Sequence, residues 1–236
     1  MPLHIISVGG SLIVPEEIDT GYLSAFKQFV LERISRGERF ILIAGGGRVA
    51  RQYQRAAAHV STINDEEKDW LGIHATRLNA HLLRMIFKQQ AHPQILTNLD
   101  NDPVDFQESI LIGAGWKPGW STDYIAVRLA EHYKGRSLIN LSNIEYVYAE
   151  DPRINPEAKR YERMSWDDFR AIVGATWSPG LSAPFDPIAS QAAARLGLSV
   201  AIMHGKNLAN LGHYLNGESF CGTLIQEINE KKNTAD

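Results

Sequence analysis

Short apolar runs alternate along this chain with longer stretches that are apolar on one side only. The runs predict buried strands at Leu3 to Val8, Phe40 to Ala44, Ile110 to Ile112, Ser137 to Leu141, Val200 to Met203 and Thr223 to Ile225, with an extended continuation from Asn143 to Tyr148. The one-sided stretches predict helices from Thr20 to Gly37, from Arg48 onward, and over 65–90, 121–131, 165–173, 186–196 and 207–215. This order predicts the α/β class, with a mainly parallel sheet covered by helices on both faces.

Glycine-rich turns follow the first three predicted strands. They are Gly9-Gly10, Gly45-Gly46-Gly47 and the open stretch from Gly113 to Gly119. In open α/β sheets ligands bind at the carboxyl ends of the strands, where these three turns would meet. Backbone amides at helix starts attract anions, so the turns predict a nucleotide or phosphorylated ligand. The alternative for each turn is an ordinary connection between a strand and a helix with a normal cap.

Composition restricts the classes of partner. The chain has 236 residues and a formal charge of −3, which gives no electrostatic reason to expect nucleic acid or an anionic membrane. The single cysteine, Cys221, excludes an intramolecular disulfide and a cysteine cluster for zinc. The eight histidines lack metal-ligand spacing. No apolar run reaches the roughly 20 residues that span a bilayer, and the start lacks a signal-type core, so a cytoplasmic location is expected.

A series of short motifs resembles the archaeal type of uridylate kinase in the amino-acid-kinase superfamily. The motifs are VGGSLIVPE, AGGGRVARQY, DWLGIHATRLNAHLL, GWKPGWSTDYIAVRLAE, NIEYVYAEDPRINPEAK, IVGATWSPGLSAPFDPIA and GTLI, in that order over nearly the whole chain. The resemblance implies a three-layer αβα sandwich formed as a single domain over residues 1–236, with the acceptor side in the N-terminal part and mainly the ATP side in the C-terminal part. It also implies a homohexamer that transfers the γ-phosphoryl group of ATP to UMP, with Mg²⁺ held through the ATP phosphates.

The resemblance also assigns site residues by position. On the ATP side it implies Gly9, Gly10, Gly47, Arg51, Ser142, Tyr148 and Asp151, with Gly10, Ser11 and Arg51 as the catalytic group. On the UMP side it implies Gly46, Asp69, Trp116, Lys117, Pro118, Gly119, Trp120, Ser121 and Thr122. From the residues alone, Asp69 and the arginines after Gly47 have an alternative interpretation as solvated helix surface.

The motifs depart from the family at the donor and acceptor segments. Tyr146 stands where the family has glycine beside the donor nucleoside, and Trp116 and Trp120 are bulkier than the family residues, so these positions bear on the nucleotide preference. Two other functions stay open. One is a sibling kinase for acetylglutamate or isopentenyl phosphate, which is weakened because isopentenyl and fosfomycin kinases place a histidine after the second glycine run and Gly47-Arg48-Val49-Ala50 has none. The other is a non-catalytic binding or storage protein that resembles the molybdenum storage protein.

Overall fold

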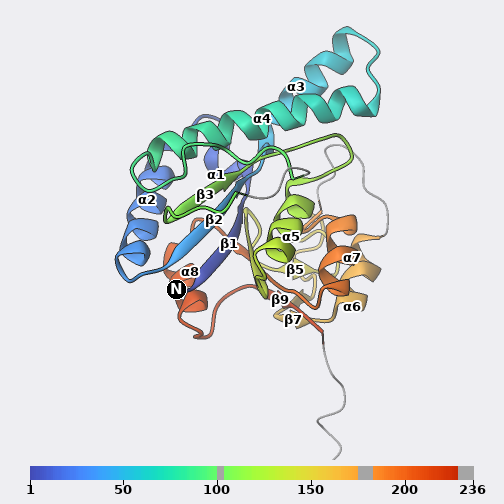
Figure 1. The fold of residues 1–236 in the computed structure, drawn as a ribbon. Helices are drawn as coiled ribbons and strands as arrows, with labels where there is room; N and C mark the ends of the chain where they lie inside the picture. Colours follow the sequence, from blue (N-terminus) through green and yellow to red (C-terminus); the bar gives the residue numbers. More distant parts are fainter. Residues whose placement is uncertain (100–103, 175–182, 228–236) are drawn as a thin grey trace, which may run out of the picture.

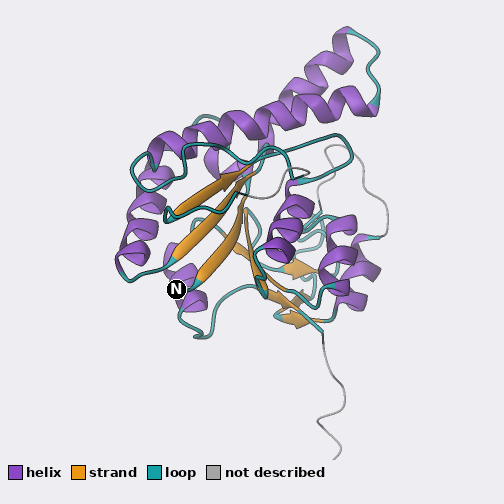
Figure 2. Cartoon of the chain, viewed as in Figure 1, coloured by secondary structure: helices purple, strands orange, loops and turns teal. Residues whose placement is uncertain are grey.

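A seven-stranded sheet forms the centre of the computed structural model, which describes residues 1–99, 104–174 and 183–227 (Figures 1 and 2). In sheet order the strands are β3 (Ile110–Gly113), β2 (Arg39–Ala44), β1 (Leu3–Val8), β4 (Ser137–Ser142), β8 (Ser199–His204), β9 (Thr223–Ile225) and β7 (Arg163–Met164). The strands from β3 to β8 are mutually parallel, and β9 is antiparallel to β8. The prediction of a mainly parallel sheet is confirmed.

Helices cover both faces of the sheet, as Figure 2 shows. One face carries α1 (Gly10–Ile13), α2 (Thr20–Ser35), α4 (Asp65–Ile86) and α8 (Leu208–Leu215), and the other carries α5 (Thr122–His132), α6 (Trp166–Val173) and α7 (Pro187–Arg195). Successive strand residues point to opposite faces. Ile5 and Ile41 therefore pack with α5, whereas Ile6 and Leu42 pack with α2 and α4. This arrangement confirms the predicted three-layer αβα sandwich.

Polar side chains fix where these helices begin. The carboxylate of Asp19 accepts the Tyr22 amide at the start of α2, and the Ser121 hydroxyl accepts the Tyr124 amide at the start of α5. Asn64 and Glu67 form a reciprocal capping box at the start of α4. Caps of this kind satisfy amides that have no partner within the helix. Ser121 is thus the cap of the helix that was predicted over 121–131.

Four details of the sequence analysis need correction. The turn after β1 continues into a helical turn, α1, and α4 ends at Ile86 rather than continuing to Gln90. The segment from Asn143 to Tyr148 is a strand only at β5 (Val147–Tyr148), because 143–146 bend. The strands β6 (Arg160–Tyr161) and β7 were not predicted. Strands of only two residues form because they pair with a neighbour, which is β5 for β6 and β9 for β7.

Residues 100–103, 175–182 and 228–236 lie outside this description, and they include the middle of the motif IVGATWSPGLSAPFDPIA, at 175–182. Within the described ranges no helix combines the length and hydropathy needed to cross a membrane.

Candidate active site

The first two glycine turns touch through their backbones. Gly10 lies against the turn after β2, where a Cβ added to Gly10 would be 2.5 Å from the Gly45 carbonyl oxygen. Gly47 has a φ of +59°, and a Cβ there would be 2.5 Å from the Ser11 amide nitrogen. Real Cβ atoms do not come so close to backbone atoms, and residues other than glycine rarely adopt this φ. The glycines therefore let the carboxyl ends of β1 and β2 meet, which brings the predicted phosphate turns together.

A cavity of about 190 Å³ opens beside the second glycine turn. It is bounded by that turn and α3 (Gly47–Val60), by the inner side of α4 and by the loop before α5. Of the predicted site residues, those lining it are Gly46, Gly47, Arg51, Asp69, Trp120, Ser121 and Thr122. The fold thus brings together residues that are up to 76 positions apart (122 − 46) in the sequence.

Asp69 joins α4 to the loop before α5. Its Oδ2 accepts the Gly119 amide at 2.7 Å. Burial raises the pKa of this carboxyl, the Gly119 bond lowers it, and the nearby charge of Asp65 raises it further. Asp69 is therefore tied to the loop before α5 and lines the cavity, which favours a role in the site over a solvated helix surface. Its predicted hydrogen bond to a ribose stays a prediction.

The inner face of α4 also holds the glycine turns through polar side chains that the sequence analysis missed. The Thr76 hydroxyl accepts the Gly115 amide at 2.7 Å, and Arg77 donates to the Gly115 and Trp116 carbonyl oxygens at 3.0 Å each. Asn79 donates to the Gly45 carbonyl oxygen at 2.8 Å. Polar residues at Thr76 and Asn79 interrupt the apolar side of the predicted helix at the i, i+3 spacing that places them together. That interruption is the feature of the sequence from which these contacts could have been predicted.

Two tryptophans of the loop before α5, Trp116 and Trp120, lie on either side of Lys117 in the same loop. The Lys117 ammonium lies 3.9 Å from the centre of the Trp116 ring and 4.8 Å from that of Trp120. Trp116 is buried in the core, and Trp120 stands edge-on to both Trp116 and Tyr124. A cation over an aromatic face is stabilised electrostatically. The bulky residues thus hold the Lys117 head group beside the cavity that Trp120 lines.

The residues expected around the ATP nucleoside lie apart from this cavity. Ser142 ends β4, Tyr148 lies in the small β5–β6 ribbon, and Asp151 follows it. Asp151 pairs with Arg153, which lowers the pKa of the carboxyl to about 2. Tyr146 is 5% exposed, edge-on to Tyr148 and 4.8 Å below the Arg160 guanidinium. Its ring therefore packs within the ribbon, and an effect on donor preference stays a prediction.

Asp123 and Asp186 form a carboxylate pair at the starts of α5 and α7, in which Asp186 is buried and Asp123 is partly buried. Asp123 accepts hydrogen bonds from the Ser7 hydroxyl, the Asn140 amide group and the Asp186 backbone amide, each at 3.2 Å. Burial and then the charge of Asp186 raise the pKa of Asp123 to about 7. Asp123 lies in the first turn of α5, where the helix dipole alone explains an acidic residue, so the sequence gives no further signal for it. Ser7 and Asn140 come from the ends of adjacent strands, so Asp123 is a further candidate site residue.

This pair predicts a specific pH dependence. Between the ordinary carboxyl pKa of about 3.9 and about 7, folded Asp123 binds a proton that the unfolded chain has released. Stability should therefore fall as the pH rises through that window. Asp186→Asn keeps a cap for α7 but removes the neighbouring charge, so the decline in melting temperature between pH 5 and 8 should become shallower. Asp167→Asn, at an exposed carboxylate, is the control, and parallel curves for all three proteins would contradict this account.

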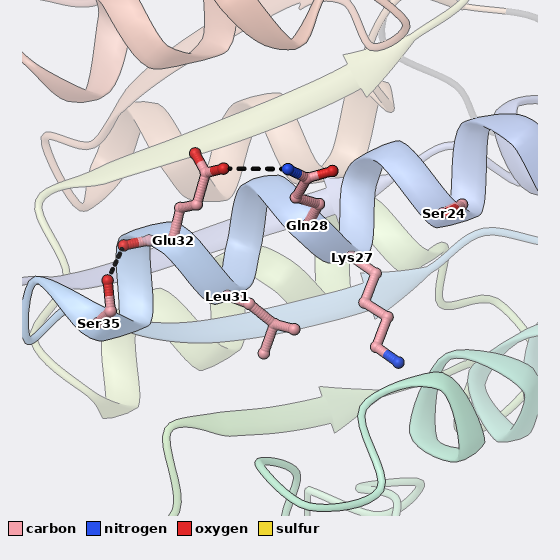
Figure 3. Close-up of a pocket in the computed structure, with 6 residues that line it drawn as sticks. All are labelled: Ser24, Lys27, Gln28, Leu31, Glu32 and Ser35. Carbon is pink, nitrogen blue, oxygen red and sulfur yellow. Dashed lines mark hydrogen bonds between the residues drawn. The ribbon is translucent and has the colours of Figure 1, made fainter.

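A second depression follows the outer surface of α2 (Figure 3). Its lining comes from that helix alone and consists of Ser24, Lys27, Gln28, Leu31, Glu32 and Ser35. The polar groups there bond within the helix, with Gln28 donating to Glu32 at 3.3 Å and the Ser35 hydroxyl to the Glu32 carbonyl at 2.7 Å. Groups from different elements do not converge here as they do at the glycine turns. We therefore assign the candidate site to the cavity at the turns.

The described residues contain no group of three or more histidine, cysteine and acidic side chains arranged to hold a metal ion. Magnesium characteristically keeps several waters and binds through one or two carboxylates together with substrate phosphates. Asp123 accepts hydrogen bonds from Ser7, two residues before the first glycine turn, and from Asn140 of the adjacent strand, and the Asp186 amide also donates to Asp123. These few carboxylates therefore fit a Mg²⁺ ion that is bound mainly by substrate phosphates.

Comparisons with known proteins agree with this geometry. The model of the amino acid kinase family matches residues 2–204. A uridylate kinase of Pyrococcus abyssi is 32% identical over 224 residues, which cover 94% of this chain and 98% of that protein. A uridylate kinase of Methanospirillum hungatei is 34% identical over 95% of both chains. The crystal structure of uridylate kinase from Archaeoglobus fulgidus superposes with a TM-score of 0.79 at 27% identity, covering 95% of this chain and all of that one. The chain belongs to the amino acid kinase family and resembles its archaeal uridylate kinases over nearly its whole length.

Proposed function

We propose that this protein is a UMP kinase that transfers the γ-phosphoryl group of ATP to UMP and releases UDP and ADP. One observation carries the proposal. The two glycine turns meet through their backbones beside a cavity that Arg51 and Asp69 also line, within a chain that matches a uridylate kinase over 94% of its length. Turns of this kind present amides to phosphate groups. Two such turns in contact can hold a donor and an acceptor phosphate close together.

The proposed mechanism depends on position and charge. Phosphoryl transfer needs the attacking and leaving oxygens in line and the charge of the moving group neutralised. We assign Gly9, Gly10, Ser11 and Gly47 to the donor phosphates, and Asp69 to the acceptor ribose. The acceptor phosphate is already ionised, so no general base is required. Mg²⁺ bound to the ATP phosphates would supply further positive charge.

Acceptor contacts come from the second turn and the loop before α5 in this proposal. Gly46 and the residues Trp116, Lys117, Pro118, Gly119, Trp120, Ser121 and Thr122 surround UMP, and Ser142, Tyr148 and Asp151 approach the ATP nucleoside. The N-terminal part of a single domain over residues 1–236 thus forms the acceptor side. A cytoplasmic location, a role in pyrimidine nucleotide synthesis and a homohexamer belong to the same proposal, and they rest on the resemblance.

Arg51 is expected to act mainly on the moving charge. It lines the cavity one turn into α3, and burial lowers the pKa of its guanidinium, as do the neighbouring Arg55 and Arg48. Arg51→Ala should lower kcat about tenfold or more with little change in the KM for UMP, because the contact strengthens in the transition state. Arg55→Ala, one turn further along the same helix, should retain nearly normal kcat. Equal kcat values for the two variants would assign Arg51 to the solvated helix surface.

A panel of acceptors tests the proposed function. ADP production from ATP and Mg²⁺ should depend on UMP and should be faster with UMP than with CMP, AMP, acetylglutamate or isopentenyl phosphate. A thermal-shift screen of the same compounds shows which of them bind. Stabilisation by UMP without ADP production would favour a binding or storage protein, and production with another acceptor would identify a sibling kinase.

A further inference from the structure

One side of α3 carries all the residues that this helix contributes to the candidate cavity. They are Gly47, Ala50, Arg51 and Gln54. Their spacing is i, i+3, i+4 and i+7, which places them along a single side of a helix. Arg51 and Gln54 therefore supply the two long polar side chains of this side. Gln54 lies one residue beyond the motif AGGGRVARQY, so the resemblance assigns it no role.

The side-chain amide of Gln54 is held in a defined orientation. Its Nε2 donates to the Lys68 backbone carbonyl of α4 at 2.9 Å. Because a backbone carbonyl only accepts hydrogen bonds, the nitrogen of the amide must face it, and the Oε1 and the second N–H remain for a ligand. Gln54 is partly buried, whereas Tyr53 and Arg55 on either side of it are exposed. The amide is thus fixed at the cavity wall with one acceptor and one donor to offer.

Helix α4 leaves room for this amide beside Asp69. The two helices lie side by side at one end of the molecule (Figure 1). A Cβ added to Gly72 would lie 3.2 Å from the Gln54 Nε2, closer than an ordinary van der Waals contact. Glycine at position 72 therefore keeps open the space that the amide occupies. Lys68 and Gly72 are one turn apart and Asp69 follows Lys68, so the amide and the Asp69 carboxylate belong to the same stretch of wall.

The two side chains suit the two hydroxyls of a ribose. Asp69 offers a carboxylate, and its Oδ2 already accepts the Gly119 amide. Gln54 offers an uncharged acceptor and a donor. Each of the two neighbouring ribose hydroxyls donates one hydrogen bond and can accept others. A carboxylate and an amide on one wall can therefore take one hydroxyl each.

The position of Arg51 indicates which hydroxyl Gln54 meets. Arg51 is assigned to the phosphoryl group that moves to the acceptor phosphate, and Gln54 follows it by three residues on the same side of α3, about 4.5 Å along the helix axis. In UMP the 3′-carbon is bonded to the carbon that carries the 5′-phosphate arm, whereas the 2′-carbon is bonded to the carbon that carries the base. The hydroxyl nearer the phosphate is thus the 3′-hydroxyl. Asp69 is left with the 2′-hydroxyl.

We propose that Gln54 binds the 3′-hydroxyl of the acceptor ribose and, together with Asp69 at the 2′-hydroxyl, makes the site specific for ribonucleotides. This inference rests on the proposed function, because it names the group of that acceptor that Gln54 contacts. The 3′-hydroxyl takes no part in the transfer, so the contact stabilises the bound acceptor and the transition state alike. Loss of the amide should therefore raise the KM for UMP and hardly change kcat.

The first test compares acceptors that lack one hydroxyl. In the wild type kcat/KM should be about threefold to tenfold higher for UMP than for 3′-deoxy-UMP, because one uncharged hydrogen bond is lost. Gln54→Met keeps the length of the side chain without the amide. It should bring this ratio close to one, while the preference for UMP over dUMP stays. Gln52→Met, at an exposed residue of the same helix, is the matched control and should keep both ratios.

A purely structural role for Gln54 gives a different result. Loss of the bond to Lys68 alone would slow the reaction with all three acceptors by the same factor and leave both ratios as in the wild type. Circular dichroism shows whether each variant is folded. An unchanged ratio of UMP to 3′-deoxy-UMP in folded Gln54→Met, or a wild type that uses both acceptors equally well, overturns the proposal.

Calorimetry without ATP separates this inference from the proposed function. The wild type should bind UMP about threefold to tenfold more tightly than 3′-deoxy-UMP, and Gln54→Met should bind the two equally. Equal affinities in a wild type that binds and phosphorylates UMP would overturn the role of Gln54 alone. A folded wild type that neither binds nor phosphorylates UMP would contradict the proposed function and the role of Gln54 with it.

Discussion

Gly10→Ala should abolish nearly all phosphoryl transfer. A Cβ at this position would lie 2.5 Å from the Gly45 carbonyl oxygen, and the atoms in its way belong to backbone that cannot rotate aside. The two glycine turns must therefore separate. Misplacement of reacting groups by about 1 Å can lower the rate a hundredfold. We expect kcat/KM to fall at least that far, with a lower melting temperature because overpacking commonly costs about 1–3 kcal/mol.

Gly21→Ala is the control for Gly10→Ala. Gly21 lies in the first turn of α2, where an added Cβ would meet only the Asp19 Oδ1, at 3.5 Å. Alanine is a better helix former than glycine by up to about 1 kcal/mol, so this variant should be as stable as the wild type or more so and fully active. Normal activity and stability in Gly10→Ala would show that the turns do not need to touch.

Loss of the Asp69 carboxylate should remove the preference for a ribose acceptor. If this carboxylate accepts hydrogen bonds from the ribose hydroxyls, then dUMP leaves a partly buried charged acceptor without one partner. Bonds of this kind contribute about 1.5–3 kcal/mol, so kcat/KM should favour UMP over dUMP roughly tenfold to a hundredfold. In Asp69→Ala the ratio should approach one.

The four values of kcat/KM, for two acceptors and two proteins, give one coupling energy. Because Asp69 also accepts the Gly119 amide, the variant should react more slowly with both acceptors, and only the ratio reports on the hydroxyl. Asp65→Ala, at an exposed carboxylate in the same helix, should keep the wild-type ratio. A coupling energy near zero would leave Asp69 with a role in holding the loop at Gly119 and none in reading the 2′-hydroxyl.

The sequence predicted the sandwich and the position of its site because both depend on local patterns. Continuous apolar runs such as Phe40 to Ala44 have few alternatives to a buried parallel strand, and glycine runs after such strands identify the turns. Seven of the residues that the resemblance implied line one cavity in the structure. Their roles toward nucleotides remain part of the proposed function.

What the sequence analysis missed depends on contacts between distant elements. The spacing of Trp70 and Leu78 predicted a helix, but it could not show that both side chains face outward while Thr76 and Asn79 face the glycine turns. Asp123 satisfied the rule for an acidic first turn, and only the fold reveals Ser7 and Asn140 beside it. The ribbon of β5 and β6 forms because its two strands find each other across an intervening loop.

The transfer of labelled phosphate is the most direct test of the central claim. The purified protein, shown to be folded, is incubated with Mg²⁺, UMP and ATP that carries a radioactive γ-phosphate. The label should appear in the β-phosphate of UDP, at a rate that depends on UMP and is greatly reduced in Arg51→Ala. Label that remains in ATP, or that appears only as inorganic phosphate whether or not UMP is present, would contradict the assignment of this protein as a UMP kinase.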